Sequence, residues 1–295
     1  MFWCYYFYMK KTSATIRYLI AVVIYGTIGF FLHYVNASSE FVVLCRGVIG
    51  SLFIGVVMLA SENLPDIKAI KNNLKYIVVS GIVLGLNWVF LFEGYRYSVA
   101  VASLCNYIAP IIVVIISSMF LKEKLNNFQI GCIILAFVGI VLISGVLDQQ
   151  SKIDYRCVIY GLLAAVGFVI LVLCNKQIKD IKPLDNTIAQ LLVSALTVLP
   201  YVIINNSFPK SLDLSSGMIL LCLGIIHTGI AYIFYFNSID ELPANKVAIY
   251  GYIEPVLSVL TGAFVFNEEL SIYGIIGAVL ILASALVNEI VTSKK

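Results

Sequence analysis

The stretches YIAPIIVVIISSMFLKEKL at residues 107–125 and YIEPVLSVLTGAFVFNEEL at residues 252–270 decide the fold. They align without a gap at a constant offset of 145 residues, so that Tyr, Ile, Pro, Glu and the closing Leu coincide. Self-similarity at a fixed offset indicates that one structural unit occurs twice in a chain. The sequence is therefore predicted to consist of two related halves.

A second match places the boundaries of these halves. GLNWVFLFEG from Gly85 aligns with GIAYIFYFNS from Gly229, which pairs Trp88 with Tyr232. We assign residues 10–147 to the first half and residues 156–292 to the second. The aromatic residues 1–9 before them lack the features of a signal peptide. They are interpreted as an interfacial tail, or as an upstream extension with the natural start at Met9.

Composition places both halves in a membrane. Of 295 residues, 61% are apolar and only 12% are charged, and the mean hydropathy is +1.00, whereas a soluble domain has about a quarter of its residues charged. The apolar runs are continuous rather than alternating, which favours helices over the strands of a barrel. We predict an all-α integral membrane protein with ten transmembrane helices, each near the length of about 20 residues that a spanning helix needs. The predicted spans are 17–36, 40–60, 75–95, 98–121, 127–146, 156–175, 186–205, 217–237, 244–266 and 271–291.

The positions of Lys and Arg orient these ten spans. Fourteen of the 19 basic residues fall on the side that carries both termini, four fall on the other side, and Arg46 lies inside a span. Because cytoplasmic connections are enriched in Lys and Arg, both termini are predicted to be cytoplasmic in a multi-pass protein of the cytoplasmic membrane.

Five spans in each half make the two halves inverted copies of each other. An odd number of crossings means that the second half enters the membrane from the side opposite to the first. Inverted repeats are common in secondary transporters, whose substrate site lies near the middle of the membrane between the repeats. Duplication also builds channels and scaffolds, so this argument favours a transporter without excluding them.

Two related motifs close the fourth span of each half, FLKEKL at residues 120–125 and VFNEEL at residues 265–270. With the preceding aromatic stretch and Pro, and with ten spans in two halves, they resemble the EamA family of the drug/metabolite transporter superfamily. The resemblance covers nearly the whole chain and implies export or uptake of small metabolites, often amino acids and their derivatives. FEGYRYS at residues 92–98 departs from the commonest family pattern and leaves the subgroup open.

Glu254 is the first candidate for a substrate-binding residue. A charge in the middle of a membrane costs about 2.5–3.5 kcal/mol on insertion scales, so an ionisable side chain there is a functional candidate. The equivalent residue of the first half is Ala109. We interpret Glu254 as a proton acceptor or as the counter-charge of a substrate ammonium group; the alternative is a neutral, hydrogen-bonded structural acid.

Arg46 is the candidate of opposite sign. Arginine can bind a substrate carboxylate through two parallel hydrogen bonds, so Arg46 and Glu254 together could recognise a zwitterion such as an amino acid. The alternatives are that Arg46 extends to the outer interface or pairs with Glu40.

Several aromatic residues are predicted to surround these charges. They could line a pocket that stacks on a ring or holds a cation, although aromatic residues at helical spacing also serve plain packing. Tyr250 lies one helical turn before Glu254 on the same face. The candidates are Tyr107, Tyr252, Trp88, Tyr232 and Tyr250.

The remaining candidates are polar groups and prolines within apolar runs. His227 could relay protons, and Asn87 and Asn106 could contact substrate, but each could equally be a packing contact between helices. Pro110 and Pro255 are predicted to kink their helices.

Residues at the ends of spans and pairs of small residues are given structural roles. We expect Glu123 and Glu268 to hold loop backbone or a neighbouring Lys. Glycine pairs such as Gly47 with Gly50 and Gly81 with Gly85 are expected to let helices approach closely.

Motifs of other protein classes are missing. The sequence has no phosphate-binding loop, no HExxH and no GxSxG, and its seven cysteines are scattered. We therefore predict no enzyme activity, no metal and no cofactor, and as partners a small-molecule substrate and the lipid bilayer, with a homodimer left open and no nucleic acid. The predicted function is a permease for a small polar metabolite, with an amino acid or related amine as the predicted substrate, working by alternating access with proton coupling left open. The alternatives are a lipid-linked sugar flippase and, less favoured, an integral-membrane enzyme acting on a lipid carrier.

Overall fold

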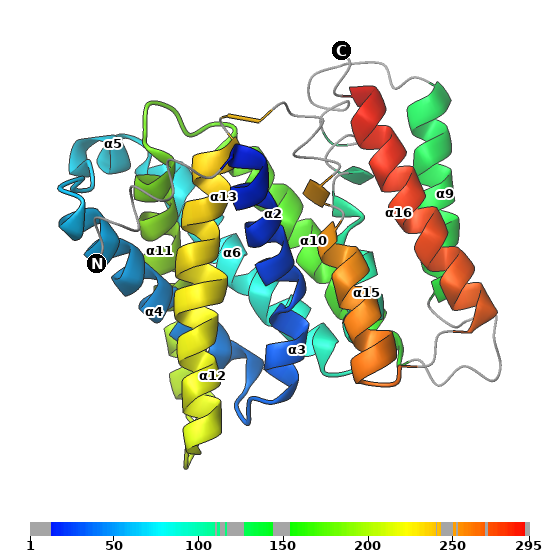
Figure 1. Cartoon of the computed structure of the whole chain (residues 1–295), viewed down its shortest axis with the longest axis horizontal. Helices are drawn as coiled ribbons and strands as arrows, with labels where there is room; N and C mark the ends of the chain where they lie inside the picture. Colours follow the sequence, from blue (N-terminus) through cyan, green and yellow to red (C-terminus); the bar gives the residue numbers. More distant parts are fainter. Residues whose placement is uncertain are drawn as a thin grey trace.

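The structure is a computed structural model. It describes residues 13–109, 111–112, 116, 127–143, 154–239, 241–242, 250–251, 253–268 and 271–292. Within these residues all regular structure is helical, as the sequence predicts. Figure 1 shows the helices packed side by side, with their labels. The helices are α2 (Ala14–Gly26), α3 (Ile28–His33), α4 (Ser39–Ala60), α5 (Ile67–Asn72), α6 (Leu74–Tyr95), α7 (Val99–Asn106), α9 (Asn127–Ile143), α10 (Tyr155–Asn175), α11 (Pro183–Ile204), α12 (Leu214–Gly224), the π-helix η1 (Ile225–Ile230), α13 (Ala231–Ile239), α15 (Ile253–Val265) and α16 (Ile272–Thr292).

Six helical segments of the described chain are long and apolar enough to cross a membrane, and shorter apolar helices accompany them. Their side chains include many large apolar residues that are exposed to the surroundings of the bundle, as expected for helices that face lipid. The described part of the chain is thus all-helical, with helices of the length and composition that a membrane protein has. The long segments are Ala14–His33, Ser39–Ala60, Leu74–Tyr95, Tyr155–Asn175, Pro183–Ile204 and Leu214–Ser238.

Side-chain caps explain where several helices begin. Ser13, Ser38 and Ser98 each precede a helix and accept a hydrogen bond from a backbone N–H of its first turn. Asp154 and Asp213 do the same for α10 and α12. Each cap satisfies one of the N–H groups that the first turn leaves without a partner.

Glu268 supports one of these starts from a distant part of the chain. Its carboxylate accepts hydrogen bonds from Ser98 Oγ at 2.6 Å and from the backbone N–H groups of Val99 and Ala100 at 2.8 and 3.3 Å. The end of α15 is thereby attached to the beginning of α7. The prediction that Glu268 holds loop backbone is confirmed, while Glu123 lies outside the described residues.

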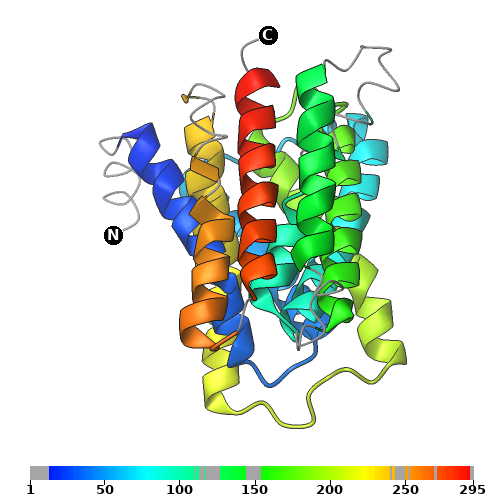
Figure 2. The same ribbon diagram turned by 90° about the vertical axis from the view of Figure 1, so that its right-hand side faces the viewer.

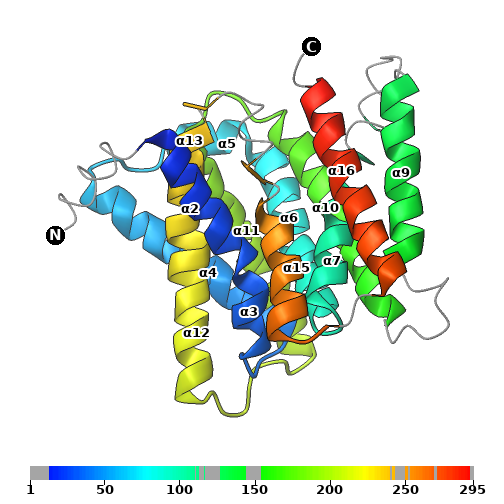
Figure 3. The same cartoon turned by 45° about the vertical axis from the view of Figure 1, so that its right-hand side comes forward.

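Contacts between connections define two ends of the bundle. At the end that we call lysine-rich, Asn73 Nδ2 donates to the carbonyl of Lys179 at 2.8 Å, and the Asp66 N–H donates to Asp185 Oδ2 at 3.1 Å. Figures 1 and 3 show the beginning of α2 and the end of α13 at this same end. The lysine-poor end holds residues 34–38 and 205–213, where the Asn36 N–H donates to Ser216 Oγ at 3.0 Å.

Helices from the two parts of the sequence interleave. Most helix contacts are made between a helix of residues 14–143 and a helix of residues 154–292. The helices α9 and α16 lie side by side at one edge of the bundle (Figures 1 and 2). The main packing pairs are α6 with α10, α2 with α13, α6 with α11, α4 with α12, α7 with α10, α2 with α15, α4 with α11, α7 with α15, and α9 with α16.

Glycines allow these helices to touch backbone to side chain. A Cβ added at Gly81 on α6 would lie 2.5 Å from Val193 Cβ on α11, and one added at Gly50 on α4 would lie 2.6 Å from Thr228 Cγ2. No real Cβ occupies so close a position without displacing its neighbour. The predicted close approach at these glycines is confirmed.

The close approach predicts opposite effects for two glycine substitutions. Gly81→Ala should lower the free energy of unfolding by about 1–3 kcal/mol because it overpacks the α6–α11 contact. Gly217→Ala, where an added Cβ meets nothing within 4 Å, should be neutral or raise it by up to about 1 kcal/mol through helix propensity. Thermal unfolding in detergent measures both, and equal stability of the two variants would contradict the packing.

Candidate functional site

Arg46 is buried in the middle of the bundle. Only 1% of its surface is exposed, and its guanidinium carbon lies 4.2 Å from the centre of the Trp88 ring and 5.2 Å from that of Phe92. The Arg46 side chain therefore does not extend to the interface. It also does not pair with Glu40, whose Oε1 accepts a hydrogen bond from Ser207 Oγ.

Polar atoms of η1 hold one edge of the guanidinium. Arg46 Nε donates to Thr228 Oγ1 at 3.0 Å, and Nη2 donates to the carbonyl of His227 at 3.5 Å. Nη1 is buried and has no hydrogen-bond partner. A buried donor of a charged group is costly to leave unpaired, so Nη1 marks a position where a ligand or a water molecule belongs.

The π-helix η1 explains why these acceptors are available. In η1 the Thr228 hydroxyl donates to the carbonyl of Leu223 at 2.9 Å and still accepts from Arg46. The wider turn changes which carbonyls the helix uses internally, and π-helical turns occur often at functional sites. Gly50 and Gly224 let α4 lie against η1 and α12: a Cβ at Gly224 would be 2.5 Å from Ile49 Cβ.

Aromatic rings surround the free part of the guanidinium. Trp88 and Tyr232 stack with ring centres 6.4 Å apart and planes 19° apart. Tyr25 lies edge-on to Tyr232, with ring centres 5.9 Å apart. The Tyr25 hydroxyl is buried without a hydrogen-bond partner, which gives the site a second unsatisfied polar atom.

Glu254 shares this environment with Arg46 without pairing to it. It lies in the first turn of α15 and is half-buried, its carboxyl group forms a hydrogen bond with the hydroxyl of Tyr107, and it is within electrostatic range of Arg46. The ion pairs found in the described chain do not include either residue. Besides Tyr107, the tyrosines within electrostatic range of Glu254 are Tyr18, Tyr25, Tyr95, Tyr232 and Tyr235. We call Arg46, Glu254, Tyr25, Trp88, Tyr107 and Tyr232 the charged chamber.

His227 is a contact between two interrupted helices. Its Nε2 lies 3.2 Å from Thr27 Oγ1, at the break between α2 and α3, and its ring packs edge-on against Phe31. The Thr27 hydroxyl donates to the carbonyl of Ile24 at 2.8 Å, and Nδ1 on the other side of the His227 ring lies 3.5 Å from the carbonyl of Cys222. The geometry favours the packing interpretation of His227.

Of the other predicted site residues, the structure describes some, and others lie outside the described residues. Asn87 donates from Nδ2 to the carbonyl of Ala164 at 2.7 Å and so joins α6 to α10. Asn106 ends α7 with a buried Oδ1 that has no partner. Tyr250 is half-buried. Tyr252 and Pro110 lie outside the described residues.

Pro255 is the third residue of α15 as described. Residues 250–251 before it are also helical, and residue 252 lies outside the described residues. The kink expected at Pro255 stays a prediction.

Sequence reasoning missed Tyr25, Tyr95 and Thr228. Tyr25 stands directly before Gly26 and Thr27, which interrupt an apolar run, and Tyr95 lies in the unusual FEGYRYS segment. Thr228 and Gly229 follow His227, so a polar and flexible triplet inside a span was the available signal for η1. Among the described residues, no group of three His, Cys, Asp or Glu side chains is placed to hold a metal ion.

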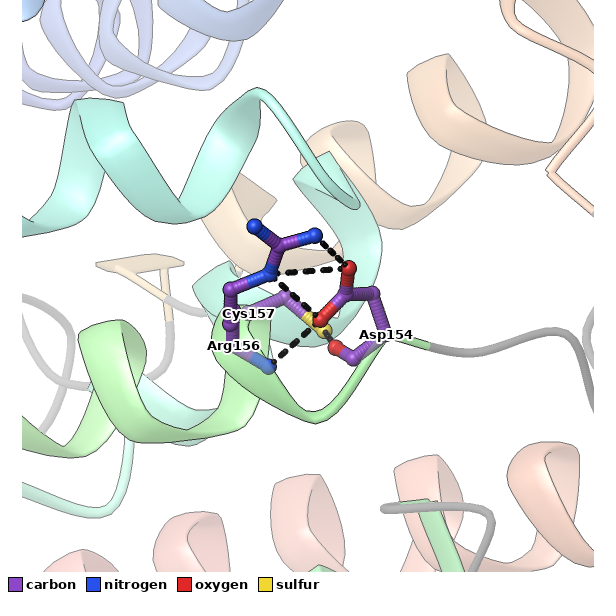
Figure 4. A network of polar contacts seen from close by, with 3 residues as sticks. All are labelled: Asp154, Arg156 and Cys157. Carbon is purple, nitrogen blue, oxygen red and sulfur yellow. Dashed lines mark hydrogen bonds and ion pairs between the residues drawn. The ribbon is translucent and has the colours of Figure 1, made fainter.

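A second arginine cluster lies at the lysine-poor end (Figure 4). Arg156 Nε donates to Asp154 Oδ1 at 3.0 Å, and its guanidinium carbon lies 4.3 Å from the centre of the Tyr97 ring. Hydrogen bonds from the side chain and backbone of Arg156 hold the pKa of Asp154 below its usual range. The start of α10 is thus attached to the connection that follows α6.

Comparison with known proteins follows the same division of the chain. The sequence model of the EamA-like transporter family matches residues 12–145 and again residues 155–289. The chain belongs to the EamA-like transporter family.

Other EamA-like and related proteins resemble this chain over most of its length. Uncharacterized transporter YxxF of Bacillus subtilis (strain 168) is 31% identical over 279 residues, which cover 93% of this chain and 88% of that protein. The S-adenosylmethionine uptake transporter of Rickettsia prowazekii (strain Madrid E) is 26% identical over 190 residues, 64% of this chain and 62% of that protein. A solved structure titled "Crystal structure of protein" shares the fold, with a TM-score of 0.65 at 17% identity, and covers 96% of this chain and 99% of its own. This chain is accordingly a multi-pass membrane transporter.

The contact between Thr228 and Arg46 predicts a coupling in stability. Thr228→Val should lower the free energy of unfolding by about 1–3 kcal/mol, because it leaves a second buried N–H of a charged group unpaired. In an Arg46→Met background, Thr228→Val should lower the free energy of unfolding by clearly less, since the buried charge is no longer there. Thermal unfolding of the four proteins gives the coupling.

Thr197→Val is the matched control, because the Thr197 hydroxyl bonds only the Val193 carbonyl of its own helix. Its cost should be the same with or without Arg46. Equal costs of Thr228→Val in both backgrounds would refute the described role of Thr228.

Proposed function

We propose that this EamA-like protein is a secondary transporter for a small zwitterionic metabolite, an amino acid or a related amine, that works by alternating access in the cytoplasmic membrane. The observation that carries the proposal is the charged chamber. Arg46 and Glu254 lie in one environment lined by tyrosines, they form no ion pair, and Arg46 Nη1 has no partner. Two unpaired charges of opposite sign suit a solute that carries both.

The substrate carboxylate is assigned to Arg46. Nε and Nη2 are committed to Thr228 and His227, so the guanidinium is already oriented and offers Nη1 to a ligand. An oriented donor loses little entropy when it binds, which favours affinity. Trp88 and Phe92 cover the guanidinium face and exclude competing water.

The substrate ammonium group is assigned to Glu254 and the rings beside it. A carboxylate pairs with the ammonium charge, and tyrosine faces attract cations. The R. prowazekii relative is named for uptake of S-adenosylmethionine, which contains an α-amino and an α-carboxylate group, and this supports the assignment. Proton coupling through Glu254 remains part of the proposal, because its Tyr107 hydrogen bond can serve either protonation state.

Two inverted five-helix repeats, at residues 10–147 and 156–292, would supply the alternating access, with ten spans in total. The pairing of helices supports this arrangement. The helices can be exchanged between the halves, α2 with α10, α4 with α11, α6 with α12 and α13, α7 with α15, and α9 with α16. This exchange turns every main packing pair either into another observed pair or into itself. The double match of the family model is a further support.

Two arginine contacts, whose partners Tyr97 and Glu241 are equivalent in the two halves, would hold the two ends closed. At the lysine-rich end Arg17 Nη2 lies 2.7 Å from Glu241 Oε1 and 2.9 Å from the Asn237 carbonyl. At the other end Arg156 covers Tyr97. The offset of 144 residues that relates Gly85 to Gly229 also relates Tyr97 to Glu241. Each contact would therefore join the first helix of one half to the connection that follows the third helix of the other half.

The lysine-rich end is assigned to the cytoplasm. Lys68, Lys71 and Lys75 lie there with Lys176, Lys179 and Lys182, and cytoplasmic connections carry such an excess. The termini are proposed to lie on the same side.

The chamber predicts reciprocal changes of specificity. Arg46→Gln should lower kcat/KM for a transported amino acid about 10- to 100-fold, because a hydrogen bond to a charged group is lost, and should change it little for the matching amine without a carboxylate. Glu254→Gln should likewise lower kcat/KM for the amino acid, but should change it little for the matching acid that lacks the amine. Flux into liposomes, with substrates chosen by a thermal-shift screen, measures both.

Arg96→Gln and Glu93→Gln serve as controls, since these residues pair with each other near the surface. Both should transport normally. Equal losses for all three kinds of solute, or no flux of any amino acid or amine under proton and substrate gradients, would contradict the proposal and favour a lipid-linked sugar as cargo.

The arginine contacts predict a change in opening at one end. Glu241→Gln should shift the balance toward opening at the lysine-rich end by a few-fold, because a partly exposed ion pair contributes about 1 kcal/mol or less. Hydrogen–deuterium exchange should then rise at the beginning of α2 and the end of α13 and stay unchanged at the beginning of α10. A uniform rise along the chain would instead indicate general destabilisation.

A further inference from the structure

Six exposed lysines gather at one place on the lysine-rich end. They come from two connections that are more than 100 residues apart in the sequence, one around α5 and one between α10 and α11. Figures 1 and 3 show α5 at the same end as the beginning of α2. The lysines are Lys68, Lys71, Lys75, Lys176, Lys179 and Lys182.

Buried polar contacts hold the two connections together. Asn73 and Lys179 exchange two hydrogen bonds: Asn73 Nδ2 donates to the Lys179 carbonyl at 2.8 Å, and the Lys179 N–H donates to Asn73 Oδ1 at 3.1 Å. Asp185, which is fully buried, accepts from the Asp66 N–H. These hydrogen bonds fix the two connections next to each other, so the fold itself brings the lysines to one end of the bundle.

The positive charge of this cluster is not neutralised by protein. The ion pairs of the described residues involve arginines and no lysine. Asp66 accepts from the N–H groups of Lys68 and Ala69 and so is engaged as the cap of α5. Glu62 and Asp180 are the other exposed carboxylates in the two segments, which leaves an excess of positive charge.

Apolar side chains lie beside the lysines. Leu64, Ile67 and Leu74 are 62%, 58% and 51% exposed; Ile67 is the first residue of α5, and Leu64 and Leu74 precede and follow this helix. Exposed aliphatic side chains next to a basic surface match a molecule with an anionic head and hydrocarbon tails. Free phosphate would use only the lysines.

We propose that this surface, made of α5 and the α10–α11 connection, binds an anionic phospholipid such as phosphatidylglycerol. The headgroup phosphate lies between Lys71 and Lys179, and the acyl chains lie along Leu64 and Leu74. Basic sites between membrane helices on the cytoplasmic side bind anionic headgroups in this manner. Since the residues of this surface belong to segments 61–75 and 176–182, one bound lipid links the two parts of the chain. The proposal requires only that the chain spans a membrane and is independent of the solute transported.

Binding to purified full-length protein tests this assignment. Native mass spectrometry with phosphatidylglycerol and phosphatidylcholine of equal chain length should show a clear preference for phosphatidylglycerol. Lys71→Gln combined with Lys179→Gln should weaken phosphatidylglycerol binding roughly thirty-fold, because each of the two lysines contributes its own attraction to the anionic headgroup. Lys210 is an exposed lysine in residues 205–213 at the lysine-poor end, and the Lys210→Gln variant should bind phosphatidylglycerol like the unmodified protein.

Each other outcome overturns the proposal. Equal binding of both lipids, or an equal loss with Lys210→Gln, would indicate nonspecific attraction. Thermal stabilisation by inorganic phosphate that matches stabilisation by phosphatidylglycerol would make this an anion site without lipid. Thermal unfolding without lipid verifies that the double variant is folded, and a variant that unfolds early is replaced by Lys68→Gln with Lys182→Gln, for which the same loss is expected.

Discussion

The burial of one guanidinium group constrains the centre of this transporter. An arginine inside a membrane protein must find partners for its charge and its N–H groups, and Arg46 finds only some of them in Thr228, His227, Trp88 and Phe92. To supply these, the segment Leu214–Ser238 contains a π-helix, and α4 approaches this π-helix closely at Gly50. What the protein leaves unpaired, Nη1, is the position that a substrate can satisfy.

The same constraint relates the site to the scaffold around it. Broken segments meet beside the arginine, where the interruption between α2 and α3 contacts η1 through Thr27 and His227. Transporters place binding sites at such discontinuous helices, where backbone polar groups become available. Small residues elsewhere keep the helices in tight contact.

Much of the fold could be predicted from the sequence because a lipid environment allows few structures. Apolar length alone located the long helices, and Glu268 was assigned correctly from its place at the end of a span. The site was harder. Arg46, Trp88, Tyr232 and Glu254 were recognisable as charges or aromatic residues in apolar runs, whereas Asn87 proved to join two helices and Tyr25 escaped notice. Periodicity reveals which residues are inside a span, but the rotation of each helix about its axis depends on packing with distant helices, as the π-turn at Thr228 illustrates.

The most direct test of the account is an experimental structure with an amino acid bound, chosen as the ligand that most raises the melting temperature. The account predicts that the ligand carboxylate lies within hydrogen-bonding distance of Arg46 Nη1 and that its ammonium group faces Glu254 among the tyrosine rings. A ligand seated elsewhere, with Nη1 still enclosed by protein atoms alone, would contradict it.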